Sequence, residues 1–88
     1  MAGINAELKF EIKKEVGVIG EGTKGWKKEV NFVSWNDRKA KLDIRDWNET
    51  HDKMGRGITL SMDEAKKLTD LIKNVNFEVM DQADPLME

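Results

Sequence analysis

Tryptophans and basic side chains are the residues of this 88-residue chain whose chemistry best suits a ligand. Trp26, Trp35 and Trp47 stand among the lysines and arginines of the central part. Aromatic rings stack on unpaired bases, at ~1 to 3 kcal/mol for each base, while cations follow the phosphates. The pattern is typical of a surface for single-stranded nucleic acid, although it also suits a protein-protein interface.

Catalytic and metal chemistry is poorly supported. The chain has no cysteine and one histidine, His51, which no serine nucleophile in a recognisable turn accompanies. Four carboxylates would offer oxygen ligands to Mg²⁺: Asp43, Asp46, Glu49 and Asp52. Such groups are usually solvated or paired, and Asp43 and Arg45 stand two apart on one strand face. We expect a non-enzyme without a metal or another cofactor.

Charge is divided unevenly along the chain, although the formal net charge is only -2. Residues 24–56 hold nine basic and six acidic side chains, whereas residues 61–88 hold three and seven. A basic half would suit phosphates, and the acidic half would serve as the scaffold.

Membrane insertion is not predicted, because no apolar run approaches the ~18 residues that a spanning helix needs. The first residues, 1–6, lack the basic and apolar regions of a secretory leader. We expect a cytoplasmic protein, in a nucleoid-associated form if it binds DNA, with no membrane partner and no small-molecule substrate.

Strands are predicted over most of the basic half and before it. Apolar and charged residues alternate over 8–13, and a bulge would let 16–19 continue that strand. Three glycines make 20–25 a flexible turn. Residues 26–35 form a second strand, Asn36 and Asp37 supply a hairpin turn, and 41–47 form a third.

The third strand predicts which side chains meet the ligand. Trp47 has the parity of Lys41 and Arg45, whereas Leu42 and Ile44 have the opposite parity. If the two aliphatic residues face the core, Trp47 and Arg45 lie on the wet face. Truncating Trp47 would then weaken binding and spare stability. The parity of Trp26 and Trp35 stays unresolved.

The segment 48–57 is predicted to be a polar loop before a short fourth strand, 58–60. Gly55 and Gly57 would let backbone N–H groups approach a phosphate beside Lys53 and Arg56. The alternative is that the two glycines only shape the turn.

A helix is predicted to begin after Ser61, which forms a capping box with Glu64. Apolar residues at 65, 68, 72, 75 and 79 give this helix one apolar face, interpreted as core and dimer seam. The helix is expected to end near 74–76, and the acidic tail 77–88 to fray.

The elements predict a single α+β domain over 1–88, with a structured core over about 7–76. Four antiparallel strands would form a curved sheet followed by one C-terminal helix. A chain this short buries only ~60 to 65% of its unfolded surface, so a homodimer is expected.

Two motifs resemble a known family. Residues 41–47 read Lys-Leu-Asp-Ile-Arg-Asp-Trp, and 53–61 read Lys-Met-Gly-Arg-Gly-Ile-Thr-Leu-Ser. Both are similar to the DNA-binding domain of the transcriptional positive cofactor four (PC4) family. The segments 26–29 and 34–37 are most similar to its bacterial YdbC-like branch. The resemblance covers roughly residues 7–74.

The resemblance implies a symmetric ββββα dimer that binds single-stranded DNA, or RNA, with little sequence preference in transcription, replication or repair. Arg45 and Trp47 match the DNA-contacting pattern of the family. The full set of predicted nucleic-acid-binding residues is Trp47, Arg45, Lys41, Trp35, Lys27, Lys28, Trp26, Lys39, Lys53 and Arg56. A protein-protein adaptor that uses the same aromatic and basic face is the alternative.

Overall fold

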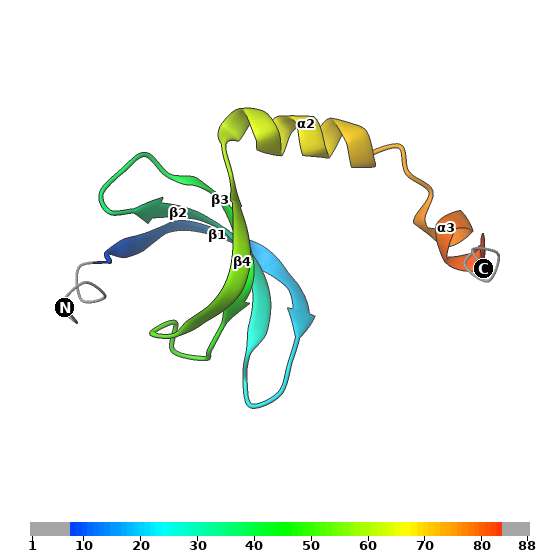
Figure 1. Ribbon diagram of the computed structural model, residues 1–88. Helices are drawn as coiled ribbons and strands as arrows, with labels where there is room; N and C mark the ends of the chain where they lie inside the picture. Colours follow the sequence, from blue (N-terminus) through cyan, green and yellow to red (C-terminus); the bar gives the residue numbers. More distant parts are fainter. Residues whose placement is uncertain (1–7, 84–88) are drawn as a thin grey trace.

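Four strands and two helices make up the computed structural model, which describes residues 8–83 (Figure 1). They are β1 (Phe10–Glu21), β2 (Lys27–Trp35), β3 (Lys41–Trp47), β4 (Met54–Leu60), α2 (Met62–Ile72) and α3 (Phe77–Ala83). The strands form one open antiparallel sheet in the order β1-β2-β3-β4. The predicted α+β class and strand topology are confirmed. Neither described helix is long and apolar enough to cross a membrane.

β1 is a long edge strand that contains three irregularities. Its register against β2 shifts between Ile12 and Lys14, between Glu15 and Gly17, and between Val18 and Gly20. Each extra residue bends the strand and increases its twist. The predicted continuation of the first strand past a bulge is confirmed, and the bulges help the sheet to curl.

β4 begins four residues before the predicted fourth strand, so the expectation of a loop up to residue 57 was wrong. Gly57 pairs with Arg45 of β3. A Cβ atom on Gly57 would overlap the Arg45 side chain and the Ile44 carbonyl oxygen. Gly57 therefore allows close approach of two strands, whereas the sequence suggested a turn or a phosphate clamp.

The capping box of α2 is confirmed. The Ser61 hydroxyl accepts the Glu64 backbone N–H at 3.1 Å, and Glu64 accepts the Ser61 N–H at 2.9 Å. The tail differs from the prediction, because residues 77–83 form α3. Asn76 caps it by accepting the Val79 N–H at 3.1 Å. The rest of the predicted tail, 84–88, lies outside the described residues.

The two faces of the sheet have different burial. The inner face carries Trp47, Val33 and Asp43, all with 0% exposure. The rings of Phe10 in β1 and Trp47 in β3 lie 5.1 Å apart although these strands are not neighbours, so the sheet curls around this face. The outer face carries Ile44 and Ile58, and Ile58 is 53% exposed.

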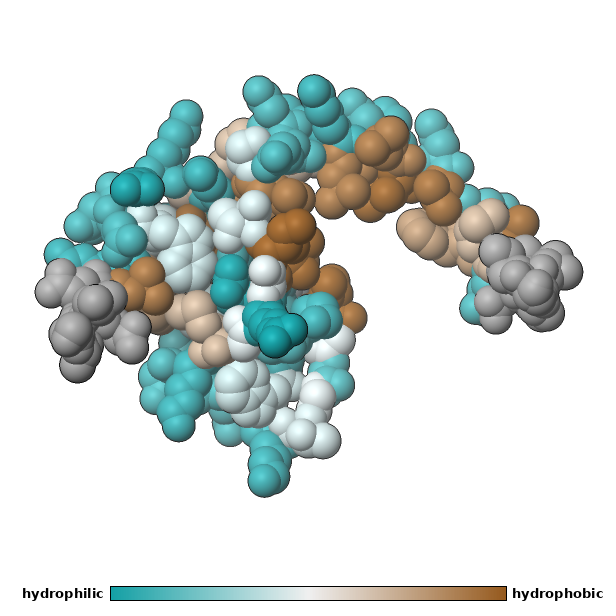
Figure 2. All heavy atoms as spheres, in the orientation of Figure 1, coloured by the Kyte–Doolittle hydropathy of each residue, from teal (hydrophilic) through white to brown (hydrophobic). Residues whose placement is uncertain are grey.

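The helices project from the sheet. α2 contacts only β3 and β4 among the described elements, and α3 contacts none of them. Figure 2 shows apolar side chains gathered beneath α2 and on the adjoining part of the sheet. The radius of gyration is 16.2 Å, whereas a compact domain of this length would have ~12 Å.

Candidate nucleic-acid interface

Trp47 is a core residue, so its predicted exposure was wrong. Its ring contacts Phe10 and lies 5.5 Å from the His51 ring, centroid to centroid. The parity argument was correct, since Trp47 shares its face with Asp43 and Arg45. The error lay in assigning that face to solvent, because the curled sheet encloses it.

Arg45 is also largely enclosed, with a side chain only 15% exposed. Its Nε and Nη2 atoms donate to the two carboxylate oxygens of Asp43 at 2.8 and 2.9 Å. The Thr59 hydroxyl donates to the same carboxylate at 2.9 Å. The buried Asp43 charge is therefore paired and hydrogen-bonded, and Arg45 is held in one orientation.

A second polar cluster lies on the same inner face. Glu29, which is 7% exposed, accepts a hydrogen bond from the Asn31 amide at 3.1 Å. The His51 Nε2 atom lies 2.9 Å from both Glu29 carboxylate oxygens. Because His51 adopts a φ of 61°, this contact ties a tightly turned loop to β2. The contact of His51 with Glu29 is therefore a structural one.

Trp35 is half-buried at the other end of β2, where the Arg45 guanidinium lies 5.0 Å from its ring centroid. A pocket of about 330 Å³ opens beside this pair. It is lined by Leu8, Trp35, Arg38, Lys39, Lys41, Arg45, Met54 and Thr59. We call it the Trp35 pocket.

Three cations of the Trp35 pocket are free to meet a ligand. Arg38, Lys39 and Lys41 are exposed, and none forms an ion pair with another residue in the range 8–83. Among residues 8–83, no carboxylate lines the pocket. The structure thus brings Trp35, Arg45, Lys39 and Lys41 together as predicted site residues.

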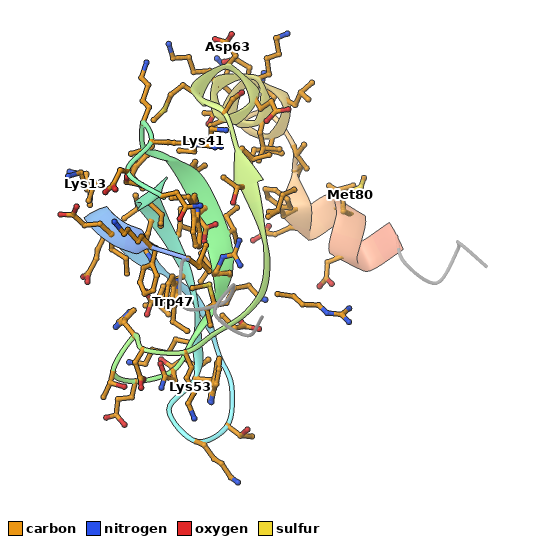
Figure 3. The ribbon with its side chains drawn as sticks, turned by 60° about the vertical axis from the view of Figure 1, so that its left-hand side comes forward. Lys13, Lys41, Trp47, Lys53, Asp63 and Met80 are labelled. Carbon is orange, nitrogen blue, oxygen red and sulfur yellow. The ribbon has the colours of Figure 1, made fainter. Side chains whose placement is uncertain are left out.

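The remaining predicted residues lie toward the opposite end of the sheet. Figure 3 shows Lys41 and Lys53 at the two ends, with Trp47 between them. Trp26 is half-buried and approaches Gly55 at the start of β4. Lys27, Lys53 and Arg56 are exposed, whereas Lys28 pairs with Asp46 at 3.2 Å.

Three of the four carboxylates considered for Mg²⁺ have other partners. Asp43 binds Arg45, and Asp46 binds Lys28. Hydrogen bonds from Thr50 and Asn48 lower the pKa of the exposed Asp52 below its usual value. Among the residues that the structure describes, no three histidine or acidic side chains gather where they would hold a metal ion.

Sequence reasoning missed several pocket residues. Arg38 was counted among the basic residues but not assigned to the site, although it directly follows the Asn-Asp turn. Met54 and Thr59 were missed because the length and register of β4 were not predicted. Leu8 lies just before β1, whose first residue, Phe10, pairs with Trp35, and this register was not predicted.

A curled four-stranded antiparallel sheet followed by helices defines a small α+β domain, and the tryptophans and exposed cations at the ends of this sheet are typical of a nucleic-acid-binding surface. The family model of Transcriptional Coactivator p15 (PC4) matches residues 23–71. The chain is also similar to an uncharacterized protein of Treponema pallidum (strain Nichols), with 33% identity over 75 residues. That alignment covers 85% of this chain and 88% of the relative.

The chain belongs to the transcriptional coactivator p15 (PC4) family, as the resemblance predicted. Nucleic-acid binding in general follows from this membership. The match begins after β1 and ends within α2, so it covers β2, β3 and β4 and the residues of the Trp35 pocket that they carry. The YdbC-like branch is compatible with these findings and stays a prediction.

Proposed function

We propose that this protein binds single-stranded DNA with little sequence preference, as a homodimer, and catalyses no reaction. The observation that carries the proposal is the Trp35 pocket, where a half-buried tryptophan lies beside three exposed cations that form no ion pair with residues 8–83. Family membership supports a nucleic acid as the ligand. Its place of action would be the cytoplasm, on DNA exposed during transcription, replication or repair.

Single strands fit this surface better than duplex. Stacking on Trp35 needs a base with a free face, which a paired and stacked base does not offer. Arg38, Lys39 and Lys41 would follow the phosphates without reading the sequence. Trp26 and the exposed cations Lys27, Lys53 and Arg56 offer similar chemistry at the far end of the sheet, so a strand would contact both ends.

The test is a fluorescence titration with oligo-dT and with a duplex of equal length over a series of salt concentrations. We expect tighter binding of the single strand, with log K falling as salt rises by ~0.7 for each phosphate contacted. Equal affinity for both would contradict stacking. The absence of any oligonucleotide binding would instead favour a protein-protein adaptor.

A second copy of the chain is the proposed cover for the outer face. The accessible surface is 7124 Å², whereas a compact protein of this mass exposes ~5,300 Å². The difference exceeds the ~800 Å² that each partner contributes to a standard interface. Partly exposed aliphatic residues contribute to this surface: Ile58, Leu68, Ile72 and Val75.

The helices support the same proposal. α2 contains no buried residue and α3 has seven residues without contacts to the other described elements. Helices this short are marginal in water, so packing against another surface must stabilise them. In a symmetric dimer the apolar side of α2 would lie on the partner's outer face, with the cationic ends of both sheets left for DNA.

A further inference from the structure

The Trp35 pocket differs in shape from an open groove that a DNA strand would follow. It is a concave site of about 330 Å³, which is near the lower end of the ~300 to 1,000 Å³ of small-molecule sites. The apolar side chains of Leu8, Trp35 and Met54 line it together with the basic residues. A site of this size suits one small ligand, such as a planar ring with attached phosphates.

The wall that would hold the ring is fixed before a ligand binds. Asp43 fixes Arg45 through two hydrogen bonds, and Arg45 also donates to the Gly55 carbonyl oxygen at 3.3 Å. The guanidinium in turn lies against Trp35. Because these groups are already ordered, a ligand would lose little free energy in arranging them.

The polar groups at the mouth are complementary to an anion. Arg38, Lys39 and Lys41 have no acidic partner among the described residues. The Thr59 hydroxyl donates to Asp43. Every charged side chain that lines the pocket, among the residues that the structure describes, is a cation. A ring bearing a phosphate chain satisfies both the apolar and the cationic parts.

We propose that the Trp35 pocket is a discrete site for one nucleotide, so that it also binds a free nucleoside triphosphate. The base lies against Trp35 and Met54, and the phosphates lie among Arg38, Lys39 and Lys41. The inference rests on the proposed function in one respect, because the same pocket then anchors one nucleotide of a DNA strand. A free nucleotide and a strand would compete for it.

The test uses the full-length protein and follows tryptophan fluorescence with dTTP, thymidine and inorganic tripolyphosphate in buffer without Mg²⁺. We expect dTTP to bind about 5- to 150-fold more tightly than tripolyphosphate, the gain that stacking of one base provides. dTTP should also displace labelled oligo-dT. Equal affinity for dTTP and tripolyphosphate would reduce the pocket to a cluster of cations and overturn the proposal.

Variants locate the site. The double substitution Lys39→Ala/Lys41→Ala should weaken dTTP binding at least about 12-fold for each charge lost, which corresponds to the lower end of the ~1.5 to 3 kcal/mol that charge-assisted hydrogen bonds contribute. The matched control is Lys66→Ala/Lys67→Ala, which removes the same charge from α2 and should leave dTTP binding unchanged. Equal effects of the two variants would contradict the assignment.

The outcomes separate this inference from single-strand binding. If oligo-dT binds and dTTP neither binds nor competes, the nucleotide site is wrong and the proposed function stands. If neither ligand binds, both proposals fail. Thermal unfolding of each variant should match that of the wild type, because Lys39 and Lys41 are exposed and form no ion pair with the described residues.

Discussion

Trp47 fills the space that the curled sheet encloses, between Phe10 of β1 and His51 of the loop before β4. Trp47→Ala should therefore lower the free energy of unfolding by ~3 to 5 kcal/mol, through lost burial and a cavity. Urea denaturation measures this change. Trp26→Ala, at a half-buried position, should have a smaller effect. If the Trp47→Ala protein were as stable as the wild type but bound DNA weakly, Trp47 would be a binding residue and not a core residue.

Arg45 contributes mainly to the stability of the fold, because its guanidinium is paired with Asp43, and less to the positive charge available for a ligand. Arg45→Ala should cost ~3 to 5 kcal/mol of stability, because it leaves the Asp43 carboxylate buried and unpaired. Adding Asp43→Asn to Arg45→Ala should recover part of that loss. Thermal unfolding of the two single variants and the double variant completes the cycle. Additive losses would show that the two side chains do not act as a pair.

The inner-face residues mark the limit of sequence reasoning about the site. The alternation in β3 correctly placed Trp47, Arg45 and Asp43 on one face, and it assigned Leu42 and Ile44 to the other. Polarity then suggested that the charged face was wet. In this protein the charged face is buried, because Arg45 and Asp43 pair with each other and the sheet curls around them. Residue polarity alone predicts neither the pairing nor the curl.

At the scale of elements, the sequence correctly predicted those features that depend on neighbouring residues, such as strand alternation and a helix cap. β3 occupies the predicted residues, and α2 begins at the predicted capping box. β4 was predicted too short because Gly55 and Gly57 read as breakers, although Gly57 is needed for contact with β3. α3 was missed because its seven residues give too little periodicity, even though Asn76 offered a cap.

The close approach of β3 and β4 gives a prediction about Gly57. Gly57→Ala should destabilise the domain by ~3 kcal/mol, because its Cβ would overlap Arg45 and the Ile44 carbonyl oxygen. The control is Gly17→Ala in β1, where nothing lies within 4 Å of the added carbon. That change should be neutral or stabilising by ~0.4 to 1 kcal/mol. Equal unfolding midpoints for the two variants would show that β4 pairs differently.

At the scale of the whole molecule, the division of charge follows the division of structure. The basic half of the sequence, residues 24–56, supplies β2, β3 and most of the cations at the ends of the sheet. The acidic half supplies the projecting helices. A dimer joined through α2 and the outer faces would hold these acidic helices together and leave the cationic ends accessible to phosphates.

Ile58 offers the cleanest test of that dimer, because it lies on the outer face and is 53% exposed within one chain. Ile58→Glu should therefore cost the folded monomer little, while placing an unpaired carboxylate in an apolar interface should cost several kcal/mol of association. Sedimentation at micromolar concentration should show a dimer for the wild type and a monomer for Ile58→Glu. The control Lys67→Glu adds a carboxylate outside the apolar face of α2 and should stay dimeric. If the Ile58→Glu protein sediments as a dimer, the outer face is not the interface. A wild-type protein that sediments as a monomer would contradict the dimer itself.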